Sequence, residues 1–95
     1  MSPAIASVRS RVIPILRAHG VVRAGVFGSR AREQADLKSD LDLLVEFEQG
    51  RTLFDLAGLH LDLEDQLQTP VDVVTYNSLH PLLRDQVLAE EVRIL

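Results

Sequence analysis

The sequence predicts an α/β (α+β) fold in which helices pack on a small mixed β-sheet. Short apolar runs typical of strands alternate along the chain with apolar repeats at helical spacing, giving the order αβαβαβαβ. The connections between these segments are short, and the chain has no internal repeat or low-complexity stretch. Its 95 residues suffice for one hydrophobic core, so we expect a single domain over residues 1–95.

Composition favours a globular protein of a reducing compartment. The apolar fraction of 46% and the charged fraction of 25% are ordinary for such a protein. The absence of cysteine excludes disulfides and thiolate metal sites, and no apolar run approaches the length of a membrane span. The N-terminus also lacks the apolar segment of a signal peptide. We therefore expect a cytoplasmic protein that does not associate with membranes.

The net charge of −4 argues against a general nucleic-acid binder, which is normally basic. The charge is unevenly spread. Residues 1–36 hold six arginines and two acidic residues, a balance of +4, whereas residues 37–95 hold four basic and twelve acidic residues, a balance of −8. A solvated helix face accounts for the arginines up to residue 17, and we expect no direct DNA binding.

The first part of the chain is predicted to form a helix, a buried strand and a short helical turn. Ser2-Pro3 is typical of a helix start, apolar residues then recur at helical spacing, and Gly20 favours a stop. Pro14 lies inside this helix and is expected to kink or split it. The segments that follow are a strand over 21–27, one or two helical turns over 29–34 and a polar loop over 35–39.

The clearest pattern in the second part is the alternation from Asp40 to Glu48. It predicts a strand with apolar side chains on one face and Asp40, Asp42 and Leu44 on the other. The later elements are a helix from Thr52 to about Leu67 with a core stripe of leucines, a strand over 71–76, a helix over 79–90 and a short strand over 92–95.

Three aspartates are the candidate catalytic and metal-ligating residues. Asp40 and Asp42 lie two residues apart on a strand, so their side chains leave the same face, with Cα atoms about 6.5 Å apart. Two carboxylates there repel each other and lose hydration unless a cation compensates, and hard oxygen ligands favour Mg²⁺ or Mn²⁺. If the strands over 40–48 and 71–76 pair, Asp72 faces both. Three carboxylates could then hold two Mg²⁺ ions, which activate an attacking hydroxyl and steady a leaving pyrophosphate.

A Gly-Ser turn directly after the strand over 21–27 is the candidate nucleotide-binding element. Gly28 allows the backbone to approach a ligand closely, and the N–H groups of a helix start suit a phosphate. Ser29 has a hydroxyl to donate to a phosphate oxygen. Arg30 and Arg32 supply positive charge beside the same turn, as a triphosphate requires.

Each of these candidates has a purely structural alternative. Asp40 and Asp42 could be solvent-exposed at a strand start, whereas this is less apt for Asp72, since a lone aspartate within Val-Asp-Val-Val is unusual in a core strand. Ser29 could be a plain helix N-cap. Arg32 could be surface charge or pair with a nearby acid, and this interpretation stands level with the functional one.

The three motifs occur together in an order that resembles a known family. Gly28-Ser29, ten intervening residues and Asp40-Leu41-Asp42 resemble the signature of the DNA polymerase β-type nucleotidyltransferase superfamily. With Arg30-Ala31-Arg32 and the run Pro70-Val71-Asp72-Val73-Val74-Thr75, nearly the whole chain is similar to the minimal nucleotidyltransferases known as MNT or MntA antitoxins.

The resemblance implies a role for each matching position. Asp40 and Asp42 would be Mg²⁺ ligands, and Asp72 the third carboxylate and the base that deprotonates the acceptor hydroxyl. Gly28 and Ser29 would hold the β- and γ-phosphates of ATP. Family members similar to this chain transfer AMP from ATP to a tyrosine of a cognate HEPN-domain ribonuclease toxin. One position departs from the family, because Glu33 stands where glycine is usual and brings negative charge near the triphosphate.

The helix predicted from Thr52 to Leu67 carries a second apolar strip beside its core stripe. This strip consists of Phe54, Ala57 and Leu61, with His60 and Glu64 between the two. We favour one broad core face with a polar pair at its edge over a separate strip used for a partner. Tyr76 could stack on a base, but we favour a tyrosine that ends its strand against the core.

Three functions remain open on the sequence alone. The leading one is a protein adenylyltransferase acting as antitoxin in a hetero-oligomer with a HEPN-domain toxin, since so small a chain needs a partner to supply acceptor specificity. The alternative is a non-catalytic antitoxin that neutralises the same partner by binding. A nucleotidyltransferase acting on a small molecule is disfavoured, because such enzymes generally need further domains to hold the acceptor.

Overall fold

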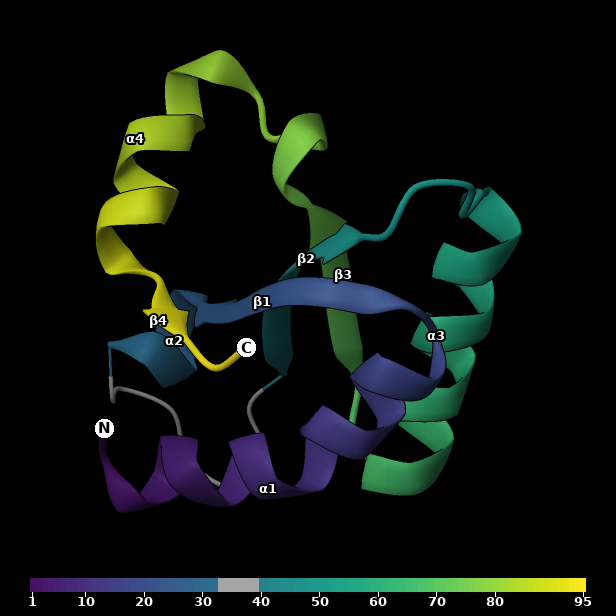
Figure 1. The fold of residues 1–95 in the computed structure, drawn as a ribbon. Coiled ribbons are helices and arrows are strands. Elements are labelled where there is room, and N and C mark those ends of the chain that lie inside the picture. Colours follow the sequence, from purple (N-terminus) through teal and green to yellow (C-terminus); the bar gives the residue numbers. More distant parts are fainter. Residues whose placement is uncertain (33–39) are drawn as a thin grey trace.

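The computed structural model describes residues 1–32 and 40–95, whose arrangement is shown in Figure 1. The helices are α1 (Pro3–Ala18), α2 (Gly28–Ala31), α3 (Leu53–Leu67) and α4 (Pro81–Glu90), with a 3₁₀ turn η1 (Tyr76–Ser78). The strands are β1 (Val21–Phe27), β2 (Leu41–Phe47), β3 (Val71–Thr75) and β4 (Val92–Arg93). The predicted loop over 35–39 and Glu33 lie outside the described residues.

The strands form one mixed sheet in the order β3-β2-β1-β4. β1 runs antiparallel to β2 and to β4, whereas β2 and β3 are parallel. The predicted small mixed sheet with helices packed on it is therefore confirmed. In this order β3 is an edge strand, so one side of its backbone is not paired within the sheet.

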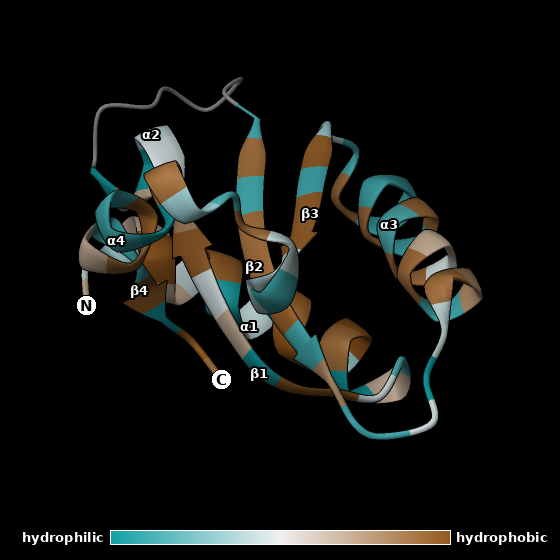
Figure 2. Ribbon diagram, turned by 90° about the horizontal axis from the view of Figure 1, so that it is seen from above, coloured by the Kyte–Doolittle hydropathy of each residue, from teal (hydrophilic) through white to brown (hydrophobic). Residues whose placement is uncertain are grey.

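The main core lies between one face of the sheet and the helices α1 and α3. Seen from above, α1 lies below the sheet and α3 lies alongside β3 (Figure 2). The fully buried side chains of this core come from both helices and from β1 and β2, and they include Leu16, Val26, Leu43, Val45, Leu59 and Leu63. Burying each stabilises the fold by about 1.5–3 kcal/mol. Leu44 is also fully buried, but it lies outside this cluster on the opposite face of β2.

Helix ends follow the signals in the sequence. Ser2 caps α1, because its hydroxyl accepts a hydrogen bond from the Ile5 amide at 3.2 Å. At α3, Thr52 and Asp55 form a reciprocal capping box, with the Thr52 amide donating to the Asp55 carboxylate at 2.7 Å. Such caps each contribute about 1 kcal/mol to helix stability.

The helix α1 continues through Pro14 as one element, so of the two expected outcomes, a kink or a split, the split is excluded. Proline removes one hydrogen bond and crowds the preceding turn, at a cost of about 3 kcal/mol. The flanking side chains Val12, Ile13, Ile15 and Leu16 are all buried against the sheet. Their burial, at roughly 1.5–3 kcal/mol each, outweighs the loss and keeps the helix intact.

Element boundaries differ from the predictions by one or two residues. Asp40 precedes β2 instead of beginning it, and Tyr76 leaves β3 to start η1. The last helix begins at Pro81, because the His80 ring nitrogen accepts the Leu82 amide at 3.1 Å and so caps it. Within residues 1–32 and 40–95, no helix combines the length and the apolarity needed to cross a membrane.

Candidate functional site

The sheet register brings two of the three candidate aspartates side by side. Asp42 on β2 pairs with Asp72 on the parallel strand β3. Paired residues of adjacent strands point to the same face, about 4.8 Å apart. Asp40 lies two residues before Asp42, immediately ahead of β2. The predicted pairing of the two strands is therefore confirmed, and it places the carboxylates of Asp42 and Asp72 on one face.

The Asp42 carboxylate lies within electrostatic reach of the other two aspartates. The pKa of Asp42 is raised by burial first, then by the negative charges of Asp72 and Asp40. Arg32 and Arg30 act in the opposite direction and lower it. The other four charged side chains predicted for the site thus lie within electrostatic reach of Asp42.

Burial of the cluster is smaller than expected. Asp42 is half-buried, whereas Asp40 and Asp72 are exposed. The expected buried or apolar-lined face is therefore found only at Asp42, beside the buried Leu44. Asp72 escapes burial because β3 is an edge strand, which the Val-Asp-Val-Val pattern alone does not reveal.

Gly28 lies directly against the Asp42 carboxylate. Its φ of +73° is a left-handed conformation that favours glycine, and a Cβ built there would overlap a carboxylate oxygen of Asp42. Both the backbone angle and the space thus require glycine at this position. The Gly-Ser turn and the aspartates, far apart in sequence, form one site.

Ser29 is the second residue of α2, and it is half-buried. The N-cap position of α2 is Phe27, which makes no side-chain capping bond, so the interpretation of Ser29 as a plain N-cap is wrong.

Arg30 and Arg32 differ in their surroundings. A guanidinium nitrogen of Arg32 lies 2.9 Å from a carboxylate oxygen of Glu90 on α4, which is the acid pairing expected as the alternative for this residue. Arg30 lines a cavity of about 410 Å³ together with residues of α1 and the end of α3.

The donor chemistry of the cluster suits a hard divalent cation. Carboxylate oxygens are the preferred ligands of Mg²⁺, and like charges around Asp42 favour a cation between them. Across residues 1–32 and 40–95, no three His, Cys, Asp or Glu side chains are arranged to hold a metal ion as they stand. The residues available for such an ion are Asp42 and Asp72 on paired positions, and Asp40 beside them.

A second polar network lies on the same sheet face and was not found from the sequence. The Tyr76 hydroxyl donates a hydrogen bond to Glu91, and the Arg23 guanidinium lies 3.8 Å from the centre of the Tyr76 ring. Burial and the neighbouring Glu91 raise the pKa of Tyr76. Tyr76 is buried, so it ends β3 against the protein interior, as we favoured, and offers no ring face to a base. The role of Glu91 could not be predicted from the sequence, because its partners lie far from it along the chain.

A groove also joins the cluster to α3. It measures about 250 Å³ and is lined by Leu53, Leu56, Ala57, His60, Asp72 and Val73. Asp72 therefore contributes both to the aspartate cluster and to a mostly apolar groove. We did not predict this groove, since we favoured a helix α3 whose apolar side chains form one broad core face.

A nucleotidyltransferase domain model matches residues 9–94, which is nearly the whole chain. The chain belongs to the nucleotidyltransferase family. A proposed protein adenylyltransferase of Methanocaldococcus jannaschii is 50% identical to it over 91 residues, covering 96% of this chain and 98% of that relative. The protein adenylyltransferase MntA of Thermococcus cleftensis is 40% identical over 75 residues, covering 79% of this chain and 76% of that protein.

Solved structures place this nucleotidyltransferase among the minimal ones. A proposed minimal nucleotidyltransferase shares 50% identity and a TM-score of 0.79, covering 93% of this chain and 90% of the other. The complex of a tri-AMPylated HEPN toxin with an MNT antitoxin from Shewanella oneidensis contains a chain with a TM-score of 0.73 at 21% identity, covering 95% and 71%. At that identity the likeness shows the fold alone. The family, the α+β fold and the enzyme class expected from the sequence are confirmed.

Proposed function

We propose that this nucleotidyltransferase transfers AMP from ATP to a tyrosine hydroxyl of a HEPN-domain toxin and thereby acts as its antitoxin. The observation that carries the proposal is the pairing of Asp42 with Asp72 beside Gly28, in a chain half identical to a proposed protein adenylyltransferase. The partner is suggested by the AMPylated HEPN toxin found with an antitoxin of the same fold.

Asp40 and Asp42 are the proposed ligands of Mg²⁺, with Asp72 as the third carboxylate. When bound, the ions supply positive charge that polarises the phosphates and offsets the carboxylate repulsion, and two ions fit the family chemistry. Asp40 and Asp72 are exposed, and exposed side chains change rotamer within nanoseconds. Rotating the Asp40 and Asp72 side chains toward Asp42 should therefore cost little free energy. The gain is larger, because a bound Mg²⁺ ion relieves the repulsion among the three carboxylates.

The proposed nucleotide contacts come from α2 and the residues around it. Gly28 lets the backbone approach the phosphates, and Ser29 donates its hydroxyl to a phosphate oxygen. Arg30 and Arg32 offset triphosphate charge, as they already offset that of Asp42. Engaging a phosphate requires Arg32 to share or exchange its contact with Glu90.

The reaction is a displacement at the α-phosphorus of ATP. The acceptor oxygen forms a new bond to the α-phosphorus while the bond to the bridging oxygen of the β-phosphate breaks, so that pyrophosphate leaves. The proton of the acceptor hydroxyl passes to the Asp72 carboxylate, which acts as general base. Its exposed position on an edge strand leaves Asp72 accessible to a hydroxyl brought by another protein.

The test mixes the protein with ATP, Mg²⁺ and a HEPN-domain toxin, and then measures the toxin's intact mass. The expected result is a mass increase of one or more AMP groups with the wild type and none with Asp40→Asn. Asp85→Asn is the matched control, because it removes an exposed carboxylate on α4 and leaves the three aspartates and α3 unchanged, and it should transfer AMP normally. Absence of transfer by the wild type would refute the catalytic proposal.

Metal binding is measurable separately from transfer. At a Mg²⁺ concentration ten times the dissociation constant, a bound ion raises the free energy of unfolding by about 1.4 kcal/mol. We expect this increase in the wild type and in Asp85→Asn, and its loss in Asp40→Asn and Asp42→Asn. Equal Mg²⁺ stabilisation in all four proteins would show that the ion binds elsewhere.

A second candidate is an antitoxin that neutralises its partner by binding without transfer. The observations that favour it are the absence, in the described residues, of three acidic or histidine side chains already arranged for a metal, and the Arg32–Glu90 ion pair. Under this hypothesis the protein binds the HEPN partner but not ATP–Mg²⁺ in calorimetry. Asp40→Asn would then protect against the toxin as well as the wild type does.

A further inference from the structure

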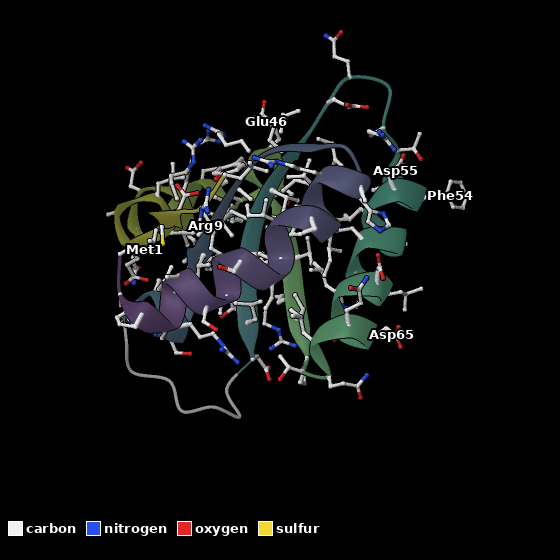
Figure 3. All side chains as sticks on the ribbon, turned by 60° about the horizontal axis from the view of Figure 1, so that its bottom comes forward. Met1, Arg9, Glu46, Phe54, Asp55 and Asp65 are labelled. Atoms are coloured by element: carbon white, nitrogen blue, oxygen red, sulfur yellow. The ribbon has the colours of Figure 1, made fainter. Side chains whose placement is uncertain are left out.

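The outer face of α3 is apolar and exposed. Leu53, Phe54 and Leu61 are 80%, 88% and 66% exposed, and Ala57 lies between them on the same side of the helix. The interpretation of this helix as one broad core face is therefore wrong, since only Leu59 and Leu63 are fully buried. Figure 3 shows Phe54 pointing away from the rest of the molecule. Such an exposed strip typically marks a protein-binding surface.

This strip borders the groove that Asp72 shares with α3. Val73 and Asp72 form the wall on β3, and the wall on α3 is mostly apolar, formed by Leu53, Leu56, Ala57 and His60. The groove of about 250 Å³ is smaller than the ~300–1,000 Å³ of pockets that enclose drug-sized ligands. It suits a single side chain better than a nucleotide.

The outer edge of β3 along this groove is not paired within the sheet. The Val71 amide points outward and donates to Glu64 on α3 at 2.9 Å, while the Pro70 carbonyl points inward and accepts from Leu41. Because backbone groups alternate along a strand, the amide and carbonyl of Val73 also point to the outer edge. An edge of this kind presents donors and acceptors to a segment of another protein.

We propose that the groove between α3 and β3 receives the acceptor side chain of a protein partner, and that the exposed strip of α3 is the docking surface around it. The proposal rests on the proposed function and names its acceptor site. Apolar walls fit an aromatic ring, and the Asp72 carboxylate fits the hydroxyl at the end of that ring. The acceptor segment thus enters from the α3 side, whereas the Gly28 turn holds the nucleotide on the β1 side of Asp42.

Charge specifies the partner further. The helix α3 has no lysine or arginine, and its acidic residues are Asp55, Asp62, Glu64 and Asp65. Arg51 pairs with Asp55 and His19 contacts Asp62, so Glu64 and Asp65 contribute most of the acidic border. The docking surface is thus apolar with an acidic border, which complements a partner patch that is apolar at its centre and basic at its rim. Association with such a patch should slow as the salt concentration rises.

The test uses variants of exposed residues, so that the fold is retained. Ala57→Arg fills the groove, and Phe54→Asp places a charge on the docking strip. Leu82→Asp is the matched control, because Leu82 is 85% exposed on α4, on the other side of the sheet. The probe is the same HEPN-domain toxin that tests the proposed function. Its affinity is measured by calorimetry and its AMP modification by intact mass, with ATP–Mg²⁺ binding and circular dichroism measured for each variant.

We expect both α3 variants to lower the transfer efficiency, kcat/KM for the protein acceptor, at least tenfold with ATP–Mg²⁺ binding unchanged. Leu82→Asp should behave as the wild type. Normal transfer by Ala57→Arg, or a loss confined to Leu82→Asp, would overturn the proposal. If the wild type transfers no AMP, the proposed function fails by itself. The docking surface is then decided by partner affinity, which Phe54→Asp must lower at least tenfold and Leu82→Asp must leave intact.

Discussion

Two acidic side chains on the same sheet face, Glu91 and Asp42, lie in opposite electrostatic surroundings. Glu91 covers Gly25 and accepts a hydrogen bond from the Tyr76 hydroxyl, whose ring is covered by Arg23. Asp42 has Asp72 beside it, and burial and like charge raise its pKa. The first acid has its partners within the fold, whereas the second has neighbours that destabilise its charged form.

The surroundings of Glu91 stabilise the fold, whereas those of Asp42 do not. A charge whose partners are built into the fold contributes to folding, and removing one partner exposes the desolvation cost of the other. A cluster of like charges beside a required glycine has no such benefit, and acids with perturbed pKa values concentrate at functional sites. The comparison therefore predicts opposite responses to mutation at Asp42 and at Tyr76.

The largest expected effect is the loss of activity in Asp42→Asn. Asparagine keeps the shape but removes the charge, so AMP transfer should fall by at least ~100-fold, the lower end of the effect of a catalytic group. The free energy of unfolding should stay equal or rise slightly, by less than about 1 kcal/mol, because repulsion from Asp72 and Asp40 is relieved. Transfer assays and urea unfolding measure the two. A clear loss of stability would show that Asp42 is a structural acid like Glu91.

The pH dependence of stability sharpens the same contrast. The pKa of Asp42 is raised in the folded protein above 3.8, so the folded state binds protons more tightly than the unfolded state there. The stabilisation from this proton is fully present below pH 3.8 and is lost as the pH rises through the raised pKa. Without Mg²⁺, the wild type should therefore lose stability relative to Asp42→Asn across this range. An unchanged difference between the two proteins would contradict the raised pKa.

A smaller effect is expected at the glycine that touches Asp42. Gly28→Ala places a methyl group on the Asp42 carboxylate and an alanine at a φ of +73°. Gly50→Ala is the matched control, because its φ is +90° and nothing lies within 4 Å of the added carbon. Both should be destabilised by roughly 1–3 kcal/mol of backbone strain, but Gly28→Ala should lose more and should also lose transfer activity. Equal effects in both variants would mean that Asp42 moves aside without consequence.

Tyr76→Phe should change stability without changing activity. It removes the hydroxyl that donates to Glu91 and keeps the ring under Arg23. A hydrogen bond to a charged group contributes about 1.5–3 kcal/mol, so unfolding should require that much less free energy. AMP transfer at a temperature where both proteins are folded should stay within about threefold of the wild type, which corresponds to less than 1 kcal/mol in the barrier. A larger loss of transfer would join the two regions into one site.

The contrast also explains which features the sequence could predict. The strands and helices follow from local periodicity. The pairing of Asp42 with Asp72 follows from the parallel arrangement of β2 and β3, which α3 connects. The Tyr76–Glu91 contact joins residues that carry no shared pattern, so it required coordinates. The exposure of Phe54 and Leu61 was misjudged, because an apolar strip on a helix shows that the residues seek a partner but not whether this chain supplies it.

The smallest expected effect concerns Arg32, which links the two regions. Its guanidinium lowers the pKa of Asp42 and contacts Glu90, the neighbour of Glu91. The pair is partly exposed, so Glu90→Gln should change the free energy of unfolding by less than about 1 kcal/mol. If Arg32 serves the triphosphate, this variant should bind ATP–Mg²⁺ about two- to fivefold more tightly at low salt, because the competing carboxylate charge is removed. Arg32→Gln should bind it more weakly, and calorimetry at two salt concentrations measures both. Unchanged affinity in both variants would assign Arg32 to the structural network around Glu91 and leave Arg30 as the arginine of the nucleotide site.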